Sequence, residues 1–192
     1  MGKEYERKYQ AGPEILSAIR QQYGDFHPIA METTYYDTPD RALGRLRWTR
    51  RRRMENGVSI CALKTPGTND VRGEWEAESP SIRQGLEAIC AMDVPEHFRE
   101  LVKGGLVEVC GARFTRQARL ITFGSSTLEL ALDQGVFLGG GREQPFSEVE
   151  VELKSGTRQD TDAFSLQLSR DYGMTEGFVS KFERALALSR EG

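Results

Sequence analysis

The sequence has few of the residues that build disulfide-bonded or histidine-based sites. Its three cysteines, Cys61, Cys90 and Cys110, are odd in number, widely spaced and include no C-x-x-C pair. This pattern argues against a disulfide framework or a thiolate zinc site, and we expect the thiols to be small buried side chains. The two histidines, His27 and His97, have no nearby partner at a recognisable metal-binding or catalytic spacing.

Long hydrophobic runs and low-complexity segments are also missing. No apolar stretch approaches the roughly 20 residues that span a bilayer, and no signal-peptide pattern opens the chain, so we expect a cytoplasmic protein without a membrane partner. With 192 residues, 38% of them hydrophobic and 29% charged, we expect a single domain over residues 1–192 with a sizeable core. The formal net charge of −3 argues against a nucleic-acid partner.

What the sequence has in abundance is alternating charge. Glu4, Glu6 and Lys8 occupy every second position, so a strand there would carry two carboxylates and an ammonium on one face. The segment 147–154 repeats the pattern, and its charged face consists of Glu148, Glu150, Glu152 and Lys154. Because burying unpaired charge costs several kcal/mol per group, such faces must meet water, counter-charges, or a metal and its ligand.

Apolar spacing, glycines and prolines predict a domain of strands with intervening helices. Helices are expected near residues 13–24, 81–92, 95–103, 160–172 and 178–189. Strands are expected at 3–11, 29–36, 46–54, 58–64, 72–78, 112–123, 127–133 and from the turn at 139–141 through 154. Asn56-Gly57 is typical of a tight hairpin. Many hairpin-connected strands with helices between the halves indicate an antiparallel α+β domain.

The charges favour a sheet that closes on itself. A barrel sends alternate side chains inside, and about eight strands leave room for side chains or one small ligand. An interior with carboxylates on some strands and Arg and Lys on others would compensate its own charge. Carboxylate oxygens suit Mg²⁺ or Mn²⁺, and Arg forks match phosphate oxygens. The pattern therefore indicates a site for a metal-bound phosphate chain.

The charged segments also form an ordered series of motifs. The series begins at Glu4-Tyr5-Glu6-Arg7-Lys8 and continues through Tyr35–Asp40, the arginine block ending at Arg53, Ala62–Lys64, Arg72–Glu76, Leu132–Gly135, Glu148–Glu152 and Ser180–Arg184. The opening motif resembles the E-x-E-x-K signature of the CYTH family, the triphosphate tunnel metalloenzymes, and the later ones resemble that family in the same order. The resemblance covers nearly the whole chain. It implies an antiparallel eight-stranded β-barrel, a tunnel with flanking helices, which binds a small-molecule triphosphate with one or two divalent metals and in most members cleaves it.

The resemblance also implies three sets of site residues. The implied ligands of Mg²⁺ or Mn²⁺ are Glu4, Glu6, Glu150 and Glu152, with Glu148 and Asp133 close to them. The implied phosphate-binding residues are Lys8, Arg51, Arg53, Lys64, Arg72, Arg116, Lys181 and Arg184. The candidates for orienting the attacking water are Glu74 or Glu76, with Glu150 as the competitor.

The arginine block departs from the family pattern. Parity places Arg51 and Arg53 on one strand face and Arg50 and Arg52 on the other. Family members usually have apolar residues at the latter two positions. The additional arginines therefore leave the register open by one residue or mark an external anion or partner patch. The assignment of Arg116 to phosphate binding is also open, because Arg113 and Arg119 lie nearby on the same strand.

The expected reaction is attack of a metal-oriented water on the terminal phosphorus of inorganic triphosphate, with nucleoside or thiamine triphosphate as second choices. An adenylyl cyclase of the same family would make cyclic AMP and pyrophosphate from ATP, but the sequence identifies no purine pocket. A third hypothesis is a non-catalytic polyphosphate or nucleotide binder, which the carboxylates disfavour. Taken alone, the alternating glutamates would be the wet face of a strand, and Lys181 and Arg184 would be surface charges.

Overall fold

The computed structural model describes residues 2–66 and 72–190; for residues 2–4 and Arg72 it describes the backbone alone. Within this part of the chain, ten antiparallel strands form one sheet in the order β1-β6-β5-β4-β3-β7-β8-β9-β2-β10. The strands are β1 (Gly2–Glu4), β2 (Glu6–Gln10), β3 (His27–Asp37), β4 (Thr49–Glu55), β5 (Val58–Thr65), β6 (Arg72–Glu78), β7 (Val107–Phe123), β8 (Ser126–Gly139), β9 (Arg142–Ser155) and β10 (Thr175–Glu176). The helices are α1 (Pro13–Tyr23), α2 (Ala42–Arg45), α3 (Ile82–Cys90), α4 (Glu96–Leu101), the 3₁₀ turn Val102–Gly104, α5 (Arg158–Tyr172) and α6 (Lys181–Arg190).

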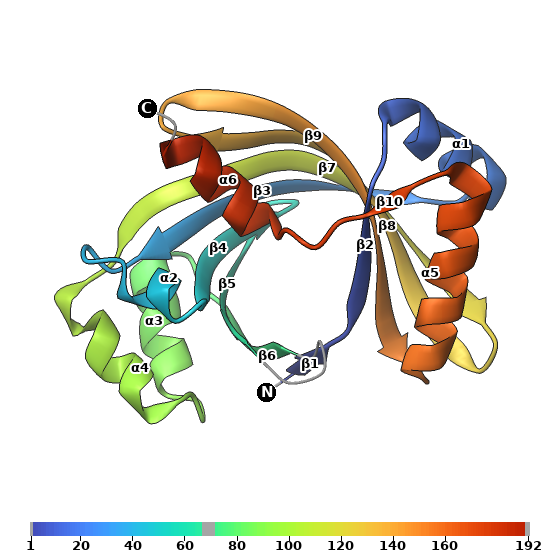
Figure 1. The fold of residues 1–192 in the computed structure, drawn as a ribbon. Helices are drawn as coiled ribbons and strands as arrows, with labels where there is room; N and C mark the ends of the chain where they lie inside the picture. The colour runs from blue at the N-terminus through green and yellow to red at the C-terminus, as the bar shows by residue number, and fades with distance from the viewer. Residues whose placement is uncertain (1, 67–71, 191–192) are drawn as a thin grey trace.

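The N-terminal segment joins the two ends of this sheet. β1 pairs with β6, whereas β2 pairs with β9 and places Glu6 opposite Glu152. Tyr5 separates the two strands, and its carbonyl accepts a hydrogen bond of 2.9 Å from the Leu153 N–H. Figure 1 shows β1 beside β6 where the sheet has curled round to meet its own beginning. The sheet therefore forms a tunnel that the covalent chain closes at Tyr5.

The prediction of an antiparallel α+β fold with flanking helices is confirmed, and the predicted barrel needs a correction. The sheet has ten strands instead of eight, and its hydrogen-bonded order is open. The opening strand is divided because its first residues follow the β6 edge and its later ones the β9 edge. The short strand β10 then adds to the outer side of β2.

The hairpin turns form where the sequence places residues that tolerate positive φ. Asn56 (φ 46°) and Gly57 (φ 89°) connect β4 to β5, and Gly140 (φ 57°) and Gly141 (φ 73°) connect β8 to β9. Two successive residues with positive φ match the right-handed twist of the flanking strands. The glycine triplet is thus a turn, as predicted, and the hairpins stack the charged strands side by side.

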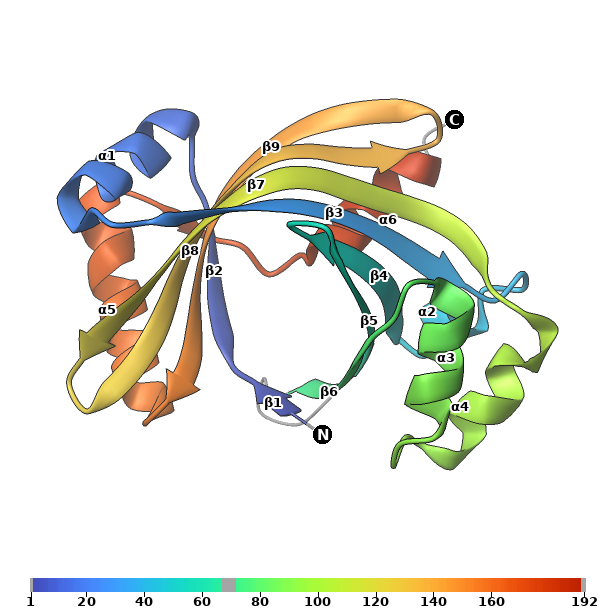
Figure 2. The ribbon, with the colours of Figure 1, turned by 180° about the vertical axis from the view of Figure 1, so that it is seen from behind.

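Helices cover the outer face of the sheet in two groups, which Figures 1 and 2 show at opposite sides of the molecule. α1 and α5 pack on β8 and β9 through a cluster that includes Ile19 and Leu168. α3 packs on β5 and β6, and the apolar cluster on this side contains Trp48, Trp75 and Phe98 of α4. α6 covers a third apolar cluster, which includes Phe114, Phe137 and Phe182, on the inward face of β7 and β8, so this face is shared by apolar and charged residues.

Several segments differ from the sequence-based prediction: β7 begins at Val107 instead of residue 112, β10 was not expected, and two further differences are residues 46–48 and the end of β8. Residues 46–48 were expected to begin a strand, but α2 precedes them and β4 begins at Thr49. The buried Asp37 carboxylate accepts hydrogen bonds from the Leu43 and Gly44 N–H groups at 3.0 and 3.1 Å, which stabilises this short helix. β8 continues to Gly139, six residues beyond the predicted end, because β7 and β9 pair with its whole length. No helix within the described ranges is long and apolar enough to cross a membrane.

Candidate functional site

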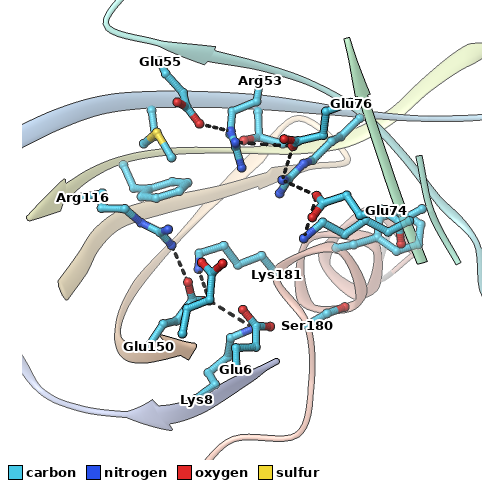
Figure 3. Close-up of a pocket in the computed structure, with 18 of the residues that line it drawn as sticks. Glu6, Lys8, Arg53, Glu55, Glu74, Glu76, Arg116, Glu150, Ser180 and Lys181 are labelled. Atoms are coloured by element: carbon cyan, nitrogen blue, oxygen red, sulfur yellow. Dashed lines mark hydrogen bonds and ion pairs between the residues drawn. The ribbon is translucent and has the colours of Figure 1, made fainter. Parts of the chain in front are cut away.

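The curled sheet encloses a cavity of about 300 Å³ whose lining carries charges of both signs. This volume is at the small end of the range for small-molecule sites, roughly 300–1,000 Å³. The carboxylates that line it are Glu6, Glu55, Glu74, Glu76, Glu129, Glu150 and Glu152. The cations that line it are Lys8, Arg51, Arg53, Lys64, Arg116, Lys154 and Lys181. Figure 3 shows side chains of both signs on each side of the cavity: Arg53 lies beside Glu55 and Glu76 on one side, and Lys8 lies beside Glu6 and Glu150 on the other.

Strand alternation explains how the arginine block is divided. Arg51 and Arg53 point into the cavity, as parity predicted. Arg50 has no exposed surface and donates hydrogen bonds to the carbonyl oxygens of Ala62 (2.8 Å) and Arg51 (2.9 Å). The interpretation of Arg50 as part of an external anion patch is therefore wrong, because a fully buried guanidinium bound to backbone carbonyls cannot face solvent.

On one wall of the cavity, formed by β4, β5 and β6, the ion pairs that Glu74 and Glu76 make are long, whereas Arg53 is also in close contact with Glu55. Arg51 Nη2 lies 3.5 Å from Glu74 Oε1 and 3.6 Å from Glu76 Oε1. Lys64 Nζ lies 3.2 Å from Glu74 Oε1, and Arg53 Nη2 lies 3.7 Å from Glu76 Oε1. Burial lowers the pKa of Arg53, and the charge of Arg51 lowers it further. An anion that entered this wall would relieve the repulsion between the two guanidinium groups. We refer to Arg51, Arg53, Lys64, Glu74 and Glu76 together as the cationic wall.

The opposite wall, on β2, β9 and β8, places three carboxylates in one row. Glu6 lies opposite Glu152, and Glu152 lies opposite Glu129. Residues directly opposite in an antiparallel pair have Cβ atoms about 4.5–5.5 Å apart. Lys154 Nζ lies 2.9 Å from Glu152 and 3.5 Å from Glu129. Lys8 lies 3.5 Å from Glu6. We refer to Glu6, Glu152 and Glu129 as the acidic row.

At the back of the cavity lies a more deeply buried group of carboxylates, which includes Glu150 of the lining. Asp133, Glu148 and Glu150 each offer an oxygen within 4.8 Å of the others, a spacing that can hold a metal ion. Asp133 and Glu148 have no exposed surface and do not line the cavity. Arg116 donates to both oxygens of Asp133 at 2.8 and 2.7 Å and also to Glu150. We call the three carboxylates the buried trio.

Burial and neighbouring cations act in opposite directions on the buried trio. Burial raises the pKa of Glu148 more than Lys181 lowers it. Burial also acts to raise the pKa of Glu150, but Lys181, Lys8 and Arg116 together outweigh it and hold that pKa well below its ordinary value. Glu150 is therefore charged at neutral pH and is surrounded by cations.

Comparison with known proteins identifies the family. The family model for the CYTH domain matches residues 2–186. The chain belongs to the CYTH domain family. It is 31% identical, over 195 residues, to the inorganic triphosphatase of Haemophilus influenzae. That match covers 98% of this chain but 55% of the relative, so this CYTH domain spans about half the length of the curated relative.

Solved structures share the fold of this CYTH domain. A Hippeastrum protein, described as an adenylyl cyclase candidate with a dominant triphosphatase activity, aligns with a TM-score of 0.67 and 18% identity over 99% of this chain and 95% of its own. A Pyrococcus horikoshii protein aligns with a TM-score of 0.65 and 22% identity over 96% of this chain and 98% of its own. These alignments support the curled antiparallel sheet as the common architecture.

The fold of this CYTH domain brings most of the predicted site residues to one cavity. Those that line it are Glu6, Lys8, Arg51, Arg53, Lys64, Glu74, Glu76, Arg116, Glu150, Glu152 and Lys181. Asp133, Glu148 and Arg184 lie behind this lining, where Arg184 Nη1 is 3.0 Å from Glu148 Oε2. The side chains of Glu4 and Arg72 are outside the described part of the chain, although their backbones are register partners in β1 and β6.

Sequence reasoning missed three charged residues of the lining, namely Glu55, Glu129 and Lys154. Each has the same parity as a residue that was predicted: Glu55 follows Arg53, Glu129 precedes Asp133 by four positions, and Lys154 follows Glu152. The alternation was thus a sufficient signal for all three. Sequence alone did not say how far along each strand the cavity extends.

Proposed function

We propose that this CYTH domain hydrolyses a triphosphate, with inorganic triphosphate as the first candidate, in a reaction that depends on Mg²⁺ or Mn²⁺. The observation that carries the proposal is a small enclosed cavity with a cationic wall on one side and an acidic row on the other. A polyanion with its divalent cation needs both signs of charge within one site. The likeness to a relative named inorganic triphosphatase agrees with this reading.

The lining favours a bare phosphate chain over a nucleotide. Its aromatic residues Tyr35, Phe114 and Phe182 are 4%, 6% and 9% exposed and pack within an apolar cluster. They leave little ring surface on which a purine or a thiazolium could stack. Nucleoside and thiamine triphosphates are therefore second candidates.

We assign phosphate binding first to Arg51, Arg53 and Lys64 on the cationic wall. Their pairs with Glu74 and Glu76 are 3.2–3.7 Å long, so a phosphate oxygen can replace either of these two carboxylates without breaking a short hydrogen bond to it. The remaining predicted phosphate-binding residues of the lining, Lys8, Arg116 and Lys181, reach the cavity from the opposite side.

The acidic row fits a divalent metal by the chemistry of its donors. Glu6, Glu152 and Glu129 present carboxylate oxygens, the hard ligands that Mg²⁺ and Mn²⁺ prefer, at one level of the cavity, and Glu150 lies one pair further along β9. We propose these residues as the ligands, with Glu4 as a further candidate. When bound, the metal would neutralise phosphate oxygens and lower the pKa of a coordinated water.

The chain's own residues account for the remaining catalytic needs. Glu74 and Glu76 lie among the phosphate-binding cations, and either carboxylate, once displaced from its cation, can accept a hydrogen bond from a water molecule. The water oxygen forms a bond to the terminal phosphorus as the bridging P–O bond breaks, which gives orthophosphate and pyrophosphate. Arg51 and Arg53 would stabilise the charge on the equatorial and leaving oxygens. Glu150 is the alternative to Glu74 and Glu76.

A substrate panel tests the proposal. Triphosphate, ATP and thiamine triphosphate are each incubated with Mg²⁺ or Mn²⁺, and the products are identified. We expect orthophosphate and pyrophosphate from triphosphate, and a fall in rate of about 100-fold or more in Glu6→Gln, which keeps the shape but removes a charged ligand. Glu143→Gln is the control, because Glu143 pairs with Arg113 on the exposed surface. Cyclic AMP from ATP would favour a cyclase, and triphosphate binding without turnover would favour a sensor.

A further inference from the structure

The ammonium of Lys181 lies at the point where a metal would contact the buried trio. Its Nζ is 2.7 Å from Asp133 Oδ2 and 2.8 Å from Glu150 Oε1, and it also contacts Glu148 Oε1. The oxygens of the three carboxylates lie within 4.8 Å of one another. The position that satisfies all three is therefore taken by an internal cation.

The remaining charge of the buried trio is also matched. Arg116 chelates Asp133 and reaches Glu150, while Arg184 Nη1 lies 3.0 Å from Glu148 Oε2. Lys8 Nζ also lies 3.2 Å from Glu150 Oε1, so three carboxylates face four cations, and Asp133 and Glu148 have no exposed surface. A divalent ion added to this group would introduce an uncompensated double charge into a buried site, so it would have to displace Lys181.

Packing holds Lys181 in this position. It is the first residue of α6, and its Nζ lies 5.3 Å from the centre of the Phe114 ring. The following residues Phe182 and Ala185 belong to the apolar cluster between α6 and the sheet. Moving the backbone of Lys181 away from the trio would therefore require α6 to shift on β7 and β8.

We infer that Asp133 and Glu148 are positioning residues that hold α6 through Lys181 and Arg184, and that Lys181 is a built-in cation that keeps divalent metal out of the buried trio. Metal binding is then left to the acidic row, with Glu150 as the one member of the trio that also lines the cavity. This inference deepens the proposed function, because it separates the carboxylates that bind metal from those that order the tunnel. It does not require turnover, so it can be tested by metal binding alone.

The test counts bound Mn²⁺ by titration with electron paramagnetic resonance. In Lys181→Met, which keeps the length of the side chain but removes its charge, we expect one more Mn²⁺ per chain than in the wild-type protein. The added ion should disappear in the double variant Lys181→Met/Glu148→Gln. Lys181→Arg, which keeps the positive charge, should bind as many Mn²⁺ ions per chain as the wild-type protein. An unchanged count in Lys181→Met would overturn the inference.

A second pair of variants decides the question if Lys181→Met does not fold. Asp133→Asn and Glu148→Gln each leave two carboxylates around the ammonium, and we expect the Mn²⁺ affinity of both to stay within twofold of the wild type. A tenfold loss of affinity in either variant would mean that the trio holds the metal and that the inference is wrong. If the wild type binds no Mn²⁺ but Lys181→Met gains one ion, the metal dependence of the proposed function fails while this inference stands.

Discussion

The buried trio and the cationic wall contain the same kinds of charged group in different arrangements. Around the trio, Lys181 and Arg116 contact Asp133 at 2.7–2.8 Å, and Asp133 and Glu148 have no exposed surface. Across the cavity, the pairs that Glu74 and Glu76 make are 3.2–3.7 Å long, and the Glu76 side chain is 40% exposed. The two regions therefore differ in how tightly their charges are already satisfied.

This difference has a physical cause that bears on function. Charges removed from water must be paired in every state of the protein, because an unpaired one would cost several kcal/mol. Charges that line a wet cavity can be paired loosely and can exchange a carboxylate for a phosphate at little cost. Tight pairs therefore mark the part of the tunnel that holds its shape, and loose pairs mark the part that receives the ligand.

The comparison predicts its largest effect on stability at the buried trio. Glu148→Gln leaves Lys181 and Arg184 without one of their carboxylates, and we expect the free energy of unfolding to fall by about 3 kcal/mol. The measurement is denaturant unfolding at neutral pH. Glu143→Gln, in an exposed pair, should change the value by less than about 0.5 kcal/mol. If Glu148→Gln and Glu143→Gln lowered the free energy of unfolding equally, the buried pairs would contribute no more to stability than an exposed pair.

The next effect is expected on activity at the cationic wall. Arg51→Met removes a phosphate-binding guanidinium, and kcat/KM for triphosphate should fall about 100-fold, or about 2.7 kcal/mol, because a charge-assisted contact is lost. Steady-state kinetics measure this change. Arg113→Met is the matched control on the surface. The free energy of unfolding of Arg51→Met should change far less than that of Glu148→Gln. If Arg51→Met lost more stability than Glu148→Gln, the assignment of ligand binding to the cationic wall and of structural support to the buried trio would be contradicted.

The smallest effect is expected at an ion pair outside the tunnel, where Arg7 Nε lies 2.7 Å from Asp162 Oδ1. Burial acts to raise the pKa of Asp162, but hydrogen bonds from Arg7 and Tyr5 hold it below the ordinary value of 3.8. Its stabilisation is therefore present above that value and is lost as the pH falls through the lower pKa of the folded state. Since Asp162 is 45% exposed, Asp162→Asn should cost less than about 1 kcal/mol at neutral pH.

Unfolding of the wild type and Asp162→Asn across the acid range checks the sign. The difference between the two proteins should be constant from pH 7 to pH 5 and should shrink below the ordinary pKa of the carboxyl group. A difference that grows as the pH falls would contradict the direction of the pKa shift. The result would allow the stabilisation by this exposed ion pair to be compared with that by the buried trio.

Local pattern was enough to predict most of the sheet and much of the lining. The alternation of Glu6 and Lys8, and of Arg51 and Arg53, follows from the two-residue period of a strand, which is independent of what surrounds it. The hairpin at Asn56-Gly57 follows from the backbone preferences of those two residues. Such features depend on neighbours in sequence, and they were predicted correctly.

The pairing of charges depended on strands that are distant in sequence. Sequence reasoning grouped Asp133 and Glu148 with the metal ligands and Lys181 and Arg184 with the phosphate-binding residues. In the fold, these four side chains meet one another at the back of the cavity, where Lys181 belongs to the lining and the other three lie behind it. Their depth is set by the curl of β8 and β9 and by the packing of α6, and neither leaves a periodic signal in the sequence.

The sequence by itself determined which residues face inward, because the side-chain period of a strand is a property of the backbone. It also determined the family, through an ordered series of motifs that spans residues 2–186. Only the tertiary structure decided how the first strand divides to join the two ends of the sheet, and which inward charges are buried and which line the cavity. Those outcomes depend on the distances between strands and on the position of α6, which form only when the whole chain packs.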